Sequence, residues 1–237
     1  MTRIDLLDAG YVRLIETWGS DSSFIEAARM STSGDFKGWG TPDVPGDERL
    51  LAYLYNNKHA TPFEMGGMIV EVKAPIFVFR EWHRHRTQSY NEMSARYIPL
   101  PDENYMPSME RLMTGANTVT TNKQAQGSKT LSELDALDFQ EELKYLYMHA
   151  HVVYMRGLQL GVPKELARLP VPVARYSRMR ASANLRNWLA FLTLRMNTAA
   201  QWEIRQYANA VGQLVKENFP RTWELFEAEF KKEGAMK

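Results

Sequence analysis

The spacing of hydrophobic residues changes along the chain, and each spacing predicts a different element. In residues 46–59 (GDERLLAYLYNNKH), Leu and Tyr recur every three to four positions, which indicates an amphipathic helix. Residues 68–73 (MIVEVK) end in an alternation of Val with Glu and Lys, the two-residue period of a strand. Pro75 suits the first turn of a further helix, yet residues 76–79 (IFVF) also have high strand propensity, so both structures stay open there.

Helical spacing dominates the second half of the chain. We expect helices over residues 131–161, after Pro163, over 184–197, over 199–219 and after Pro220. Residues 101–130 are rich in Pro, Gly, Asn, Thr and Ser and show no period, which predicts a long loop or insertion. No repeat or domain boundary is evident. Residues 1–237 are therefore interpreted as one domain with an α+β outline.

Composition and charge narrow the class of protein. The chain is 44% hydrophobic with a formal net charge of +1, which indicates a folded globule without a global positive field for nucleic acid. No apolar run reaches the roughly 18 residues of a membrane span. The N-terminal stretch MTRIDLLDAGYVRLIE carries acids inside its apolar region, unlike a signal peptide. We therefore expect a cytoplasmic protein with neither a membrane nor a nucleic acid as its partner.

The sequence also lacks several common types of site. It contains no Cys, which excludes disulfides, thiolate metal ligands and a cysteine nucleophile. Its 14 Gly form neither a G-x-G-x-x-G motif nor a P-loop, and its five His include no H-E-x-x-H motif, so we expect no metal. A phosphorylated ligand must therefore be held by side chains, and Arg suits that role best.

Residues 81–97 (EWHRHRTQSYNEMSARY) are densely polar and follow directly on an apolar run. One interpretation is a solvated face with internal ion pairs. Against it, Arg84 and Arg86 flank His85, which concentrates cationic donors in one turn. The stretch also uses Arg, Ser and Asn where solvated faces favour Lys and Glu. Those residues grip phosphate and orient a ligand, so a phosphorylated small molecule is the favoured interpretation.

The same stretch has helical spacing among its polar residues. Ser89, Glu92 and Arg96 follow His85 at +4, +7 and +11. In a helix these positions share one face. The spacing therefore predicts a single helical face that carries four types of donor or acceptor.

A second arginine cluster lies within residues 168–188 and consists of Arg168, Arg175, Arg178, Arg180 and Arg186. An RNA-binding patch is the alternative here, because Tyr176 and Trp188 could stack bases. The near-neutral total charge weakens it, since backbone binding scales with the number of phosphates neutralised. Arg195 ends an apolar helical run, and its structural alternative is a snorkelling side chain at a helix C-terminus.

These motifs resemble the flavin-dependent thymidylate synthases of the ThyX type. RHRTQSYNEMSARY (84–97) matches the family pattern R-H-R-x-x-S-x-N-E-x-S-x-R-Y at all nine specified positions. HATPFE (59–64), NLRNWLAFLTLR (184–195) and AAQWEIRQYA (199–208) resemble further family segments in the same order. The similarity extends from about residue 50 to residue 225.

The resemblance implies the ThyX-like fold, an α+β arrangement with a modest, largely antiparallel sheet and several long helices. It implies the reductive methylation of dUMP to dTMP, with 5,10-methylenetetrahydrofolate as carbon donor and NADPH as reductant through bound FAD. Unrelated thymidylate synthases attack the uracil ring with a cysteine thiolate. This chain has no Cys and fits a methyltransferase that uses no covalent enzyme nucleophile.

Residue roles follow from the resemblance position by position. It assigns FAD contacts to His59, Thr61, Arg84, His85, Arg86, Glu92, Asn184 and Arg186. It assigns dUMP contacts to Glu81, Arg84, Glu92, Ser94, Arg96, Arg168 and Arg195. Ser94 and Arg96 lie beside the phosphate in this interpretation, where a hydroxyl and a guanidinium form charge-assisted hydrogen bonds to a dianion. Arg178 and Arg180 remain structural or solvent-facing.

Arg195 has the central chemical role in the resemblance. Its counterpart points at the uracil ring, where a fixed positive charge stabilises negative charge that develops during activation. The family forms homotetramers in which several subunits build each FAD site, and we expect the same assembly here. That assembly would explain how Arg residues on distant segments converge.

Three positions depart from the family pattern. Glu81 stands where some relatives carry Gln, and an acid near a phosphate repels it unless the side chain turns away or pairs with an Arg. Met65 replaces a frequent His, and Ala190 a frequent Asn or His. A lid or folate-binding role for 101–130 is a hypothesis. A related pyrimidine nucleotide as substrate is the alternative function.

Overall fold

The structure is a computed structural model that describes residues 2–32, 34–41, 43–113 and 131–232. Within these residues, five strands form one sheet in the order β1-β2-β3-β5-β4, and every neighbouring pair is antiparallel. The strands are β1 (Arg3–Leu6), β2 (Gly10–Trp18), β3 (Gly67–Pro75), β4 (Ser89–Glu92) and β5 (Tyr176–Asn184). The expectation of an α+β fold with a largely antiparallel sheet is confirmed.

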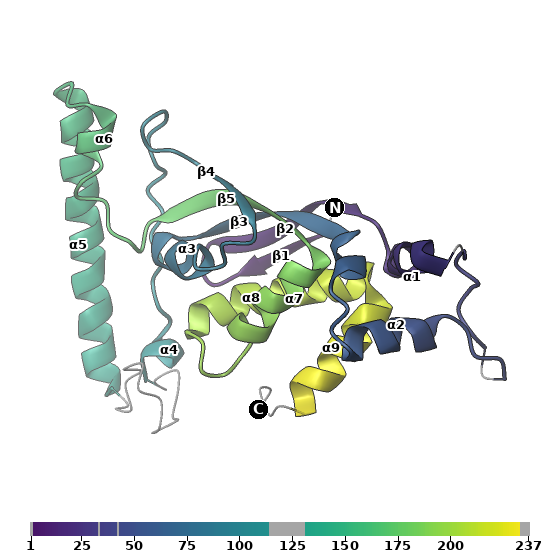
Figure 1. Cartoon of the computed structure of the whole chain (residues 1–237). Helices are drawn as coiled ribbons and strands as arrows, with labels where there is room; N and C mark the ends of the chain where they lie inside the picture. The colour runs from purple at the N-terminus through teal and green to yellow at the C-terminus, as the bar shows by residue number, and fades with distance from the viewer. Residues whose placement is uncertain (1, 33, 42, 114–130, 233–237) are drawn as a thin grey trace.

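One face of the sheet forms part of the core, and the other is polar. Alternate residues of β3, including Met68, Val70 and Val72, are fully buried, as the two-residue period predicts. Helices α7 (Leu185–Arg195) and α8 (Trp202–Asn218) lie against this face (Figure 1). On the opposite face, Glu71 pairs in register with Arg180.

The remaining helices complete the core and a separate arm. They are α1 (Asp21–Arg29), η1 (Met30–Thr32), α2 (Glu48–Asn56), η2 (Thr61–Glu64), α3 (Ile76–Trp82), α4 (Met109–Met113), α5 (Glu133–Gln159), α6 (Lys164–Ala167) and α9 (Pro220–Lys232). In α8, residues spaced by three and four, such as Ile204, Tyr207 and Val211, are fully buried. Helix α5, by contrast, stands apart from the body with α6 at its end (Figure 1). Within the described ranges, no helix is both long and apolar enough to cross a bilayer.

A buried carboxylate joins the first helix to the last. Asp21, at the start of α1, accepts hydrogen bonds from the backbone N–H of Arg221 at 2.9 Å and of Thr222 at 3.2 Å. The Thr222 hydroxyl donates a third hydrogen bond at 2.6 Å. The first N–H groups of a helix have no partner within it, so Asp21 satisfies the free donors at the start of α9.

Most helices inferred from spacing are confirmed with shifted ends. The expected helices 184–197 and 199–219 correspond to α7 and α8, and 131–161 corresponds to α5. Residues 76–79, where helix and strand stayed open, belong to α3, with Pro75 as its N-cap. A proline has no N–H to leave unpaired at that position.

The expected helical face over residues 84–97 is wrong. Helix α3 ends at Trp82, residues 83–88 form turns, and Ser89–Glu92 is the edge strand β4, paired with β5. In a strand, neighbouring side chains point to opposite faces, so Ser89 and Glu92 cannot share one. Pairing with a strand about 90 residues later in the chain overrides the local spacing.

The expected long loop at 101–130 is partly corrected. Residues 114–130 lie outside the described residues. Before them, Asn104 forms a bridge with Arg175, and Met109–Met113 is helix α4. The Tyr105 hydroxyl donates to the buried Glu203 at 3.1 Å. The described part of this segment is therefore fastened to α8.

Candidate functional site

The end of α7, the end of α3 and the turn after α3 meet around one guanidinium. Arg195 is the last residue of α7, and its Nε donates to His85 Nε2 at 2.8 Å. Its Nη1 donates to the Glu81 carboxylate at 2.6 Å, and its Nη2 donates to the Glu81 backbone carbonyl at 2.8 Å. We call Arg195, Glu81 and His85 the Arg195 cluster. Three residues that the sequence placed in the site are thus in direct contact.

The contacts of the Arg195 cluster determine the protonation of His85. Burial, and the positive charge of Arg195, lower the pKa of His85 to about 4, while Glu81 opposes this shift. The imidazole is therefore neutral at pH 7. Because the Nε–H of Arg195 can only donate, Nε2 of His85 is the acceptor and its proton lies on Nδ1. The ring thus offers a fixed donor on its other side.

The turn that carries His85 is fastened on several sides. The buried Trp82 donates from its indole N–H to Gln88 at 3.0 Å, across the turn. The Tyr90 hydroxyl donates to the backbone carbonyl of His85 at 2.6 Å. From α7, the Asn187 amide donates to the carbonyl of Thr87 at 2.9 Å. The backbone between α3 and β4 is therefore held in one conformation before any ligand binds.

Asn187 is a positioning residue that sequence reasoning missed. Asn184, predicted as an FAD contact, is the N-cap of α7, and its side-chain oxygen accepts from the Asn187 N–H at 3.0 Å. That cap fixes the first turn of α7, from which Asn187 reaches the carbonyl of Thr87. The only signal in the sequence was a second Asn three positions after the first.

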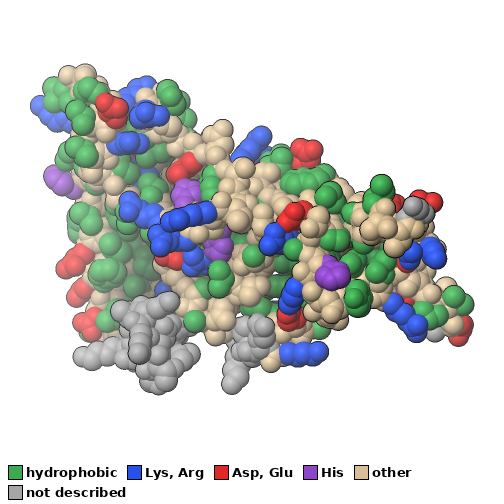
Figure 2. Space-filling model, viewed as in Figure 1, with side chains coloured by type: hydrophobic (Ala, Val, Ile, Leu, Met, Phe, Trp, Pro, Cys, Tyr) green, Lys and Arg blue, Asp and Glu red, His purple; other side chains and the backbone are tan. Residues whose placement is uncertain are grey.

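Four predicted arginines are exposed on the surface. Figure 2 shows basic and histidine side chains gathered over the region of α3 and β4. The four side chains, which we call the exposed arginines, are Arg84, Arg86, Arg96 and Arg168. In the part of the chain that the structure describes, none of them forms an ion pair. Exposed, unpaired guanidinium groups keep all their donors available for a phosphorylated ligand.

The residues after β4 that were predicted to bind the nucleotide form a tight turn. The Ser94 hydroxyl accepts from the N–H of Arg96 at 3.3 Å, and the Ser94 carbonyl accepts from the N–H of Tyr97 at 3.0 Å. Lys164 of α6 donates to the Tyr97 carbonyl at 2.7 Å, which brings the arm next to this turn. Glu92 is exposed at the end of β4. Within the described residues, no hydrogen bond or ion pair joins Arg168 to Ser94, Arg96 or Glu92, and its backbone N–H donates to the Lys164 carbonyl at 3.3 Å.

A groove between α2, α7 and α9 contains other predicted residues. It has a volume of about 320 Å³, and His59 and Arg186 lie in its wall with the apolar residues Leu189 and Phe226. Arg186 also donates to Glu64 at 2.5 Å. Ala190, one of the three departures, lines the groove, so its small side chain leaves room there.

A neighbouring cavity of about 410 Å³ brings His59 and Thr61 together with Ser31 of η1 and Met65. Ser31 is a further lining residue that the sequence reasoning missed. Its hydroxyl donates to the Ala28 carbonyl at 2.8 Å, as an ordinary helix-end contact. Nothing in the local pattern distinguished it from a loop serine.

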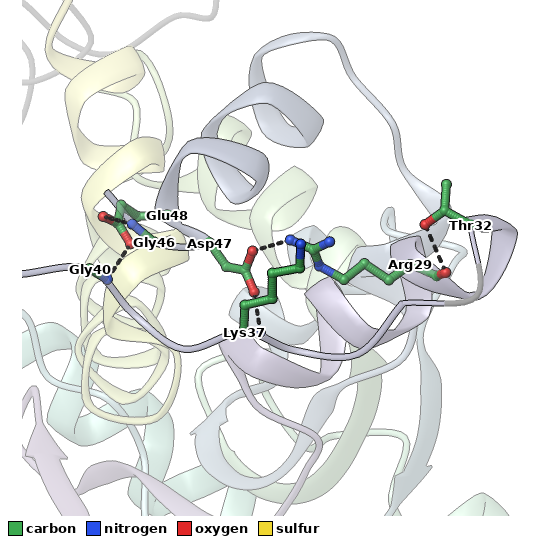
Figure 3. A network of polar contacts seen from close by, with 7 residues as sticks. All are labelled: Arg29, Thr32, Lys37, Gly40, Gly46, Asp47 and Glu48. Carbon is green, nitrogen blue, oxygen red and sulfur yellow. Dashed lines mark hydrogen bonds and ion pairs between the residues drawn. The ribbon is translucent and has the colours of Figure 1, made fainter. Parts of the chain in front are cut away.

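Two carboxylates hold the segment that follows η1 (Figure 3). Asp47 accepts from the Arg29 guanidinium and, at 2.7 Å, from the backbone N–H of Lys37. Glu48 accepts from the N–H groups of Gly40 and Gly46, each at 2.9 Å. These backbone donors lower the pKa of Glu48 to about 2. The segment after Ser31 is therefore folded back onto the start of α2.

No group of three or more His, Asp or Glu side chains is placed to hold a metal ion within the described residues. The candidate site thus consists of guanidinium groups, an imidazole, hydroxyls and apolar groove walls. This is a set suited to phosphates and an aromatic ring system.

Comparisons with known proteins agree with this set. The family model described as Thymidylate synthase complementing protein matches residues 13–221. The chain is 41% identical to a flavin-dependent thymidylate synthase of Thermus thermophilus, over 98% of this chain and 81% of that protein. It is 37% identical to one of Thermotoga neapolitana, over 94% of each.

Solved structures give the same result for the fold. The UMP/dUMP methylase PolB from Streptomyces cacaoi, bound with 5-Br dUMP, aligns with a TM-score of 0.82 at 32% identity and covers 95% of this chain and 97% of that one. The same enzyme bound with 5-Br UMP aligns with a TM-score of 0.78 at 31% identity, over 92% of this chain and 94% of that one. The resemblance in the motifs is confirmed, and the chain belongs to the family of flavin-dependent thymidylate synthases.

Proposed function

We propose that the protein methylates dUMP to dTMP reductively, with 5,10-methylenetetrahydrofolate as carbon donor and NADPH as reductant through bound FAD. The observation that carries this proposal is the Arg195 cluster, where a guanidinium is fixed by three hydrogen bonds beside a turn that bears exposed arginines. A fixed cation next to phosphate-binding groups suits a reaction in which a phosphorylated ring develops negative charge.

The groove walls support a flavin dinucleotide. Leu189 and Phe226 offer apolar contact to a flat ring system, while His59 and Arg186 offer donors to phosphates. Arg84 and Arg86 add two exposed guanidinium groups on the turn after α3. When bound, the flavin supplies the reducing equivalents that convert a transferred methylene into a methyl group. Binding and orienting the cofactor is the work of these side chains.

The nucleotide has a separate set of contacts. The turn formed by Ser94 and Arg96 presents a hydroxyl and an exposed guanidinium, which suit a phosphate dianion. The ring would then lie against Arg195, whose positive charge stabilises negative charge developing on the ring. This stabilisation is weak in water but strong in a partly buried site. Arg195 is only 16% exposed, so this condition is met.

The protein acts as a homotetramer in this proposal. Helix α5 is 27 residues long, yet it packs mainly on α4 and α6. Large apolar side chains along it are exposed, among them Leu134, Tyr145, Leu146, Met148 and Val152. Exposed apolar surface of this extent is typical of an association surface. Arg168 lies just beyond α6 on the same arm, so another copy of the chain can bring it to a site.

The test of the proposed function is dTMP formation by purified protein supplied with FAD, NADPH, 5,10-methylenetetrahydrofolate and dUMP. We expect product that depends on all four components, and a mass in solution near four chains. Oxidation of NADPH without dTMP would overturn the methylation while leaving a flavin enzyme. A monomer would overturn the assembly. A cytoplasmic location stays a prediction from the sequence.

A second candidate substrate is UMP. The structural relative PolB is described as a UMP/dUMP methylase and was solved with analogues of both nucleotides. The same assay with UMP in place of dUMP tests this alternative. Methylation of UMP at a comparable kcat/KM would favour it, and a preference of 100-fold or more for dUMP, as an order of magnitude for a site that reads one hydroxyl, would exclude it.

A further inference from the structure

Glu81 contacts Arg195 with both its side chain and its backbone. Its carboxylate accepts from Nη1 at 2.6 Å and its carbonyl accepts from Nη2 at 2.8 Å. The Glu81 side chain is 42% exposed, whereas that of Arg195 is 16% exposed. The carboxylate therefore reaches inward from the surface to the guanidinium.

These contacts fix the plane of the guanidinium. The Arg side chain has five N–H donors, and the Arg195 cluster uses three of them: Nε–H on His85 and one each from Nη1 and Nη2 on Glu81. Acceptors along two edges leave a planar group little freedom to rotate. Two N–H donors remain for a ligand, and their directions are set by the three that are used.

Glu81 also balances the charge of Arg195. In the absence of a ligand the two side chains form an ion pair, with His85 neutral beside them. A glutamine at this position would keep an oxygen acceptor for Nη1 but remove the negative charge. The substitution Glu81→Gln therefore tests the negative charge separately from the orientation of Arg195.

We propose that Glu81 is a positioning residue, which orients Arg195 toward the substrate ring and lowers the positive potential of the empty site, and does not itself bind the nucleotide. The proposal rests on the proposed function. It assigns Glu81 a role different from the direct dUMP contact expected from the resemblance. The backbone carbonyl of residue 81 remains in every variant, so a substitution removes only the side-chain contact.

The experiment compares Glu81→Ala and Glu81→Gln with the wild type, each purified with FAD. The kcat and the KM for dUMP come from dTMP formation, and the Kd for dUMP comes from the change in flavin absorbance on titration. Glu81→Ala is expected to lower kcat by about tenfold or more, since a misplaced catalytic group commonly costs that much. Glu81→Gln is expected to recover most of kcat and to bind dUMP several-fold more tightly.

The control is Glu224→Gln on α9, which removes an exposed carboxylate that has no hydrogen bond or ion pair with the Arg195 cluster in the described residues and is expected to change neither constant. A wild-type kcat in Glu81→Ala would overturn the proposal. A raised KM and Kd at unchanged kcat would also overturn it, by showing a direct nucleotide contact. Equal losses of flavin and of Tm in both Glu81 variants would overturn it in favour of a purely structural role.

Failure of the proposed function is distinguishable from failure of this inference. If the wild type forms no dTMP, the proposed reaction is refuted, while the titration of the flavin with dUMP still compares the variants. In that case tighter binding by Glu81→Gln supports the charge-balancing role. An unchanged Kd overturns it.

Discussion

The Arg195 cluster and the exposed arginines differ in how their side chains are held, although the turn after α3 contributes to both. Arg195 has three protein acceptors around it. Arg84 and Arg86, which flank His85 on that turn, extend into solvent. The difference teaches that the chain fixes in advance the group that we propose to act on developing charge. The groups that we propose to bind phosphate have no ion-pair partner in the described structure, so a ligand or another copy of the chain can supply one.

The largest effect is expected from a substitution in the Arg195 cluster. Arg195→Ala is predicted to lower the rate of dTMP formation by roughly 100-fold to 1,000-fold, because one preorganised electrostatic donor commonly contributes that much. FAD should stay bound, since Arg195 is not among the residues that line the groove. Product formation and flavin content measure the two effects. Near-normal turnover would refute the role of Arg195.

A matched variant separates charge from geometry in the same residue. Arg195→Lys keeps a positive charge but cannot reach His85 and both Glu81 acceptors with one planar group. We expect a rate well below the wild type. Full activity in the lysine variant would mean that charge alone suffices and that the three contacts are incidental.

The second largest effect is expected from a substitution among the exposed arginines. Arg84→Ala is predicted to weaken both flavin and dUMP binding, by about tenfold to 100-fold each, the scale of a lost hydrogen bond to a charged group. Fold and Tm should change little, because the side chain is exposed and unpaired in the described structure. Flavin content after purification and titration with dUMP are the measurements. Loss of Tm instead of affinity would contradict the comparison.

A third effect concerns pH and the neutral His85. The pKa of this imidazole is about 4 in the folded protein, against an ordinary value of 6.5. Between these values the unfolded chain binds a proton that the folded chain does not, so the free energy of unfolding should fall as pH falls through this window. His85 is partly exposed, which reduces the expected loss to about 1–2 kcal/mol.

Chemical denaturation at pH 7.5, 6 and 5 checks this prediction. His85→Gln keeps an acceptor for the Nε–H of Arg195 but does not titrate, so its stability should depend less on pH across that window. An equal slope in both proteins would show that other groups cause the dependence.

The smallest effect is expected at Asn187, which holds the turn shared by the Arg195 cluster and the exposed arginines. Asn187→Ala removes one hydrogen bond to the carbonyl of Thr87 and should cost about 1 kcal/mol of stability. The turn that carries His85 would then lose its hydrogen bond to α7. We expect a modest fall in kcat with flavin content unchanged, measured in parallel with Tm. A change in flavin content alone would place Asn187 in the cofactor site instead.

Local patterns predicted the parts of the fold that short-range packing determines. The spacing in 184–197 and 199–219 gave α7 and α8 because each buries a continuous apolar stripe on the sheet. Strand β5 was missed, although Arg178 and Arg180 alternate with Met179 and Ala181. Ala and Ser have low strand propensity, so only pairing with β3 and β4 makes this segment a strand.

The sequence likewise indicated some residues of the candidate site but not the contacts between them. The resemblance assigned His85 to FAD and Arg195 to dUMP, and it did not predict the contact between them that the structure shows. The partner of Glu81 was not determined by the sequence, since pairing with an Arg was only one of two ways to keep the acid from a phosphate. Asn187 and Ser31 were missed because their roles depend on where α7 and η1 end in space.

The carboxylate shared by α1 and α9 has a consequence for how the chain matures. Asp21 meets its partners about 200 residues later in the sequence, so they leave the ribosome long after Asp21 does. Long-range contacts of this kind are slow to form. Until the last helix arrives, the start of α1 holds a carboxylate without those donors. The packing of α1 against α9 can therefore be completed only after α9 has been synthesised.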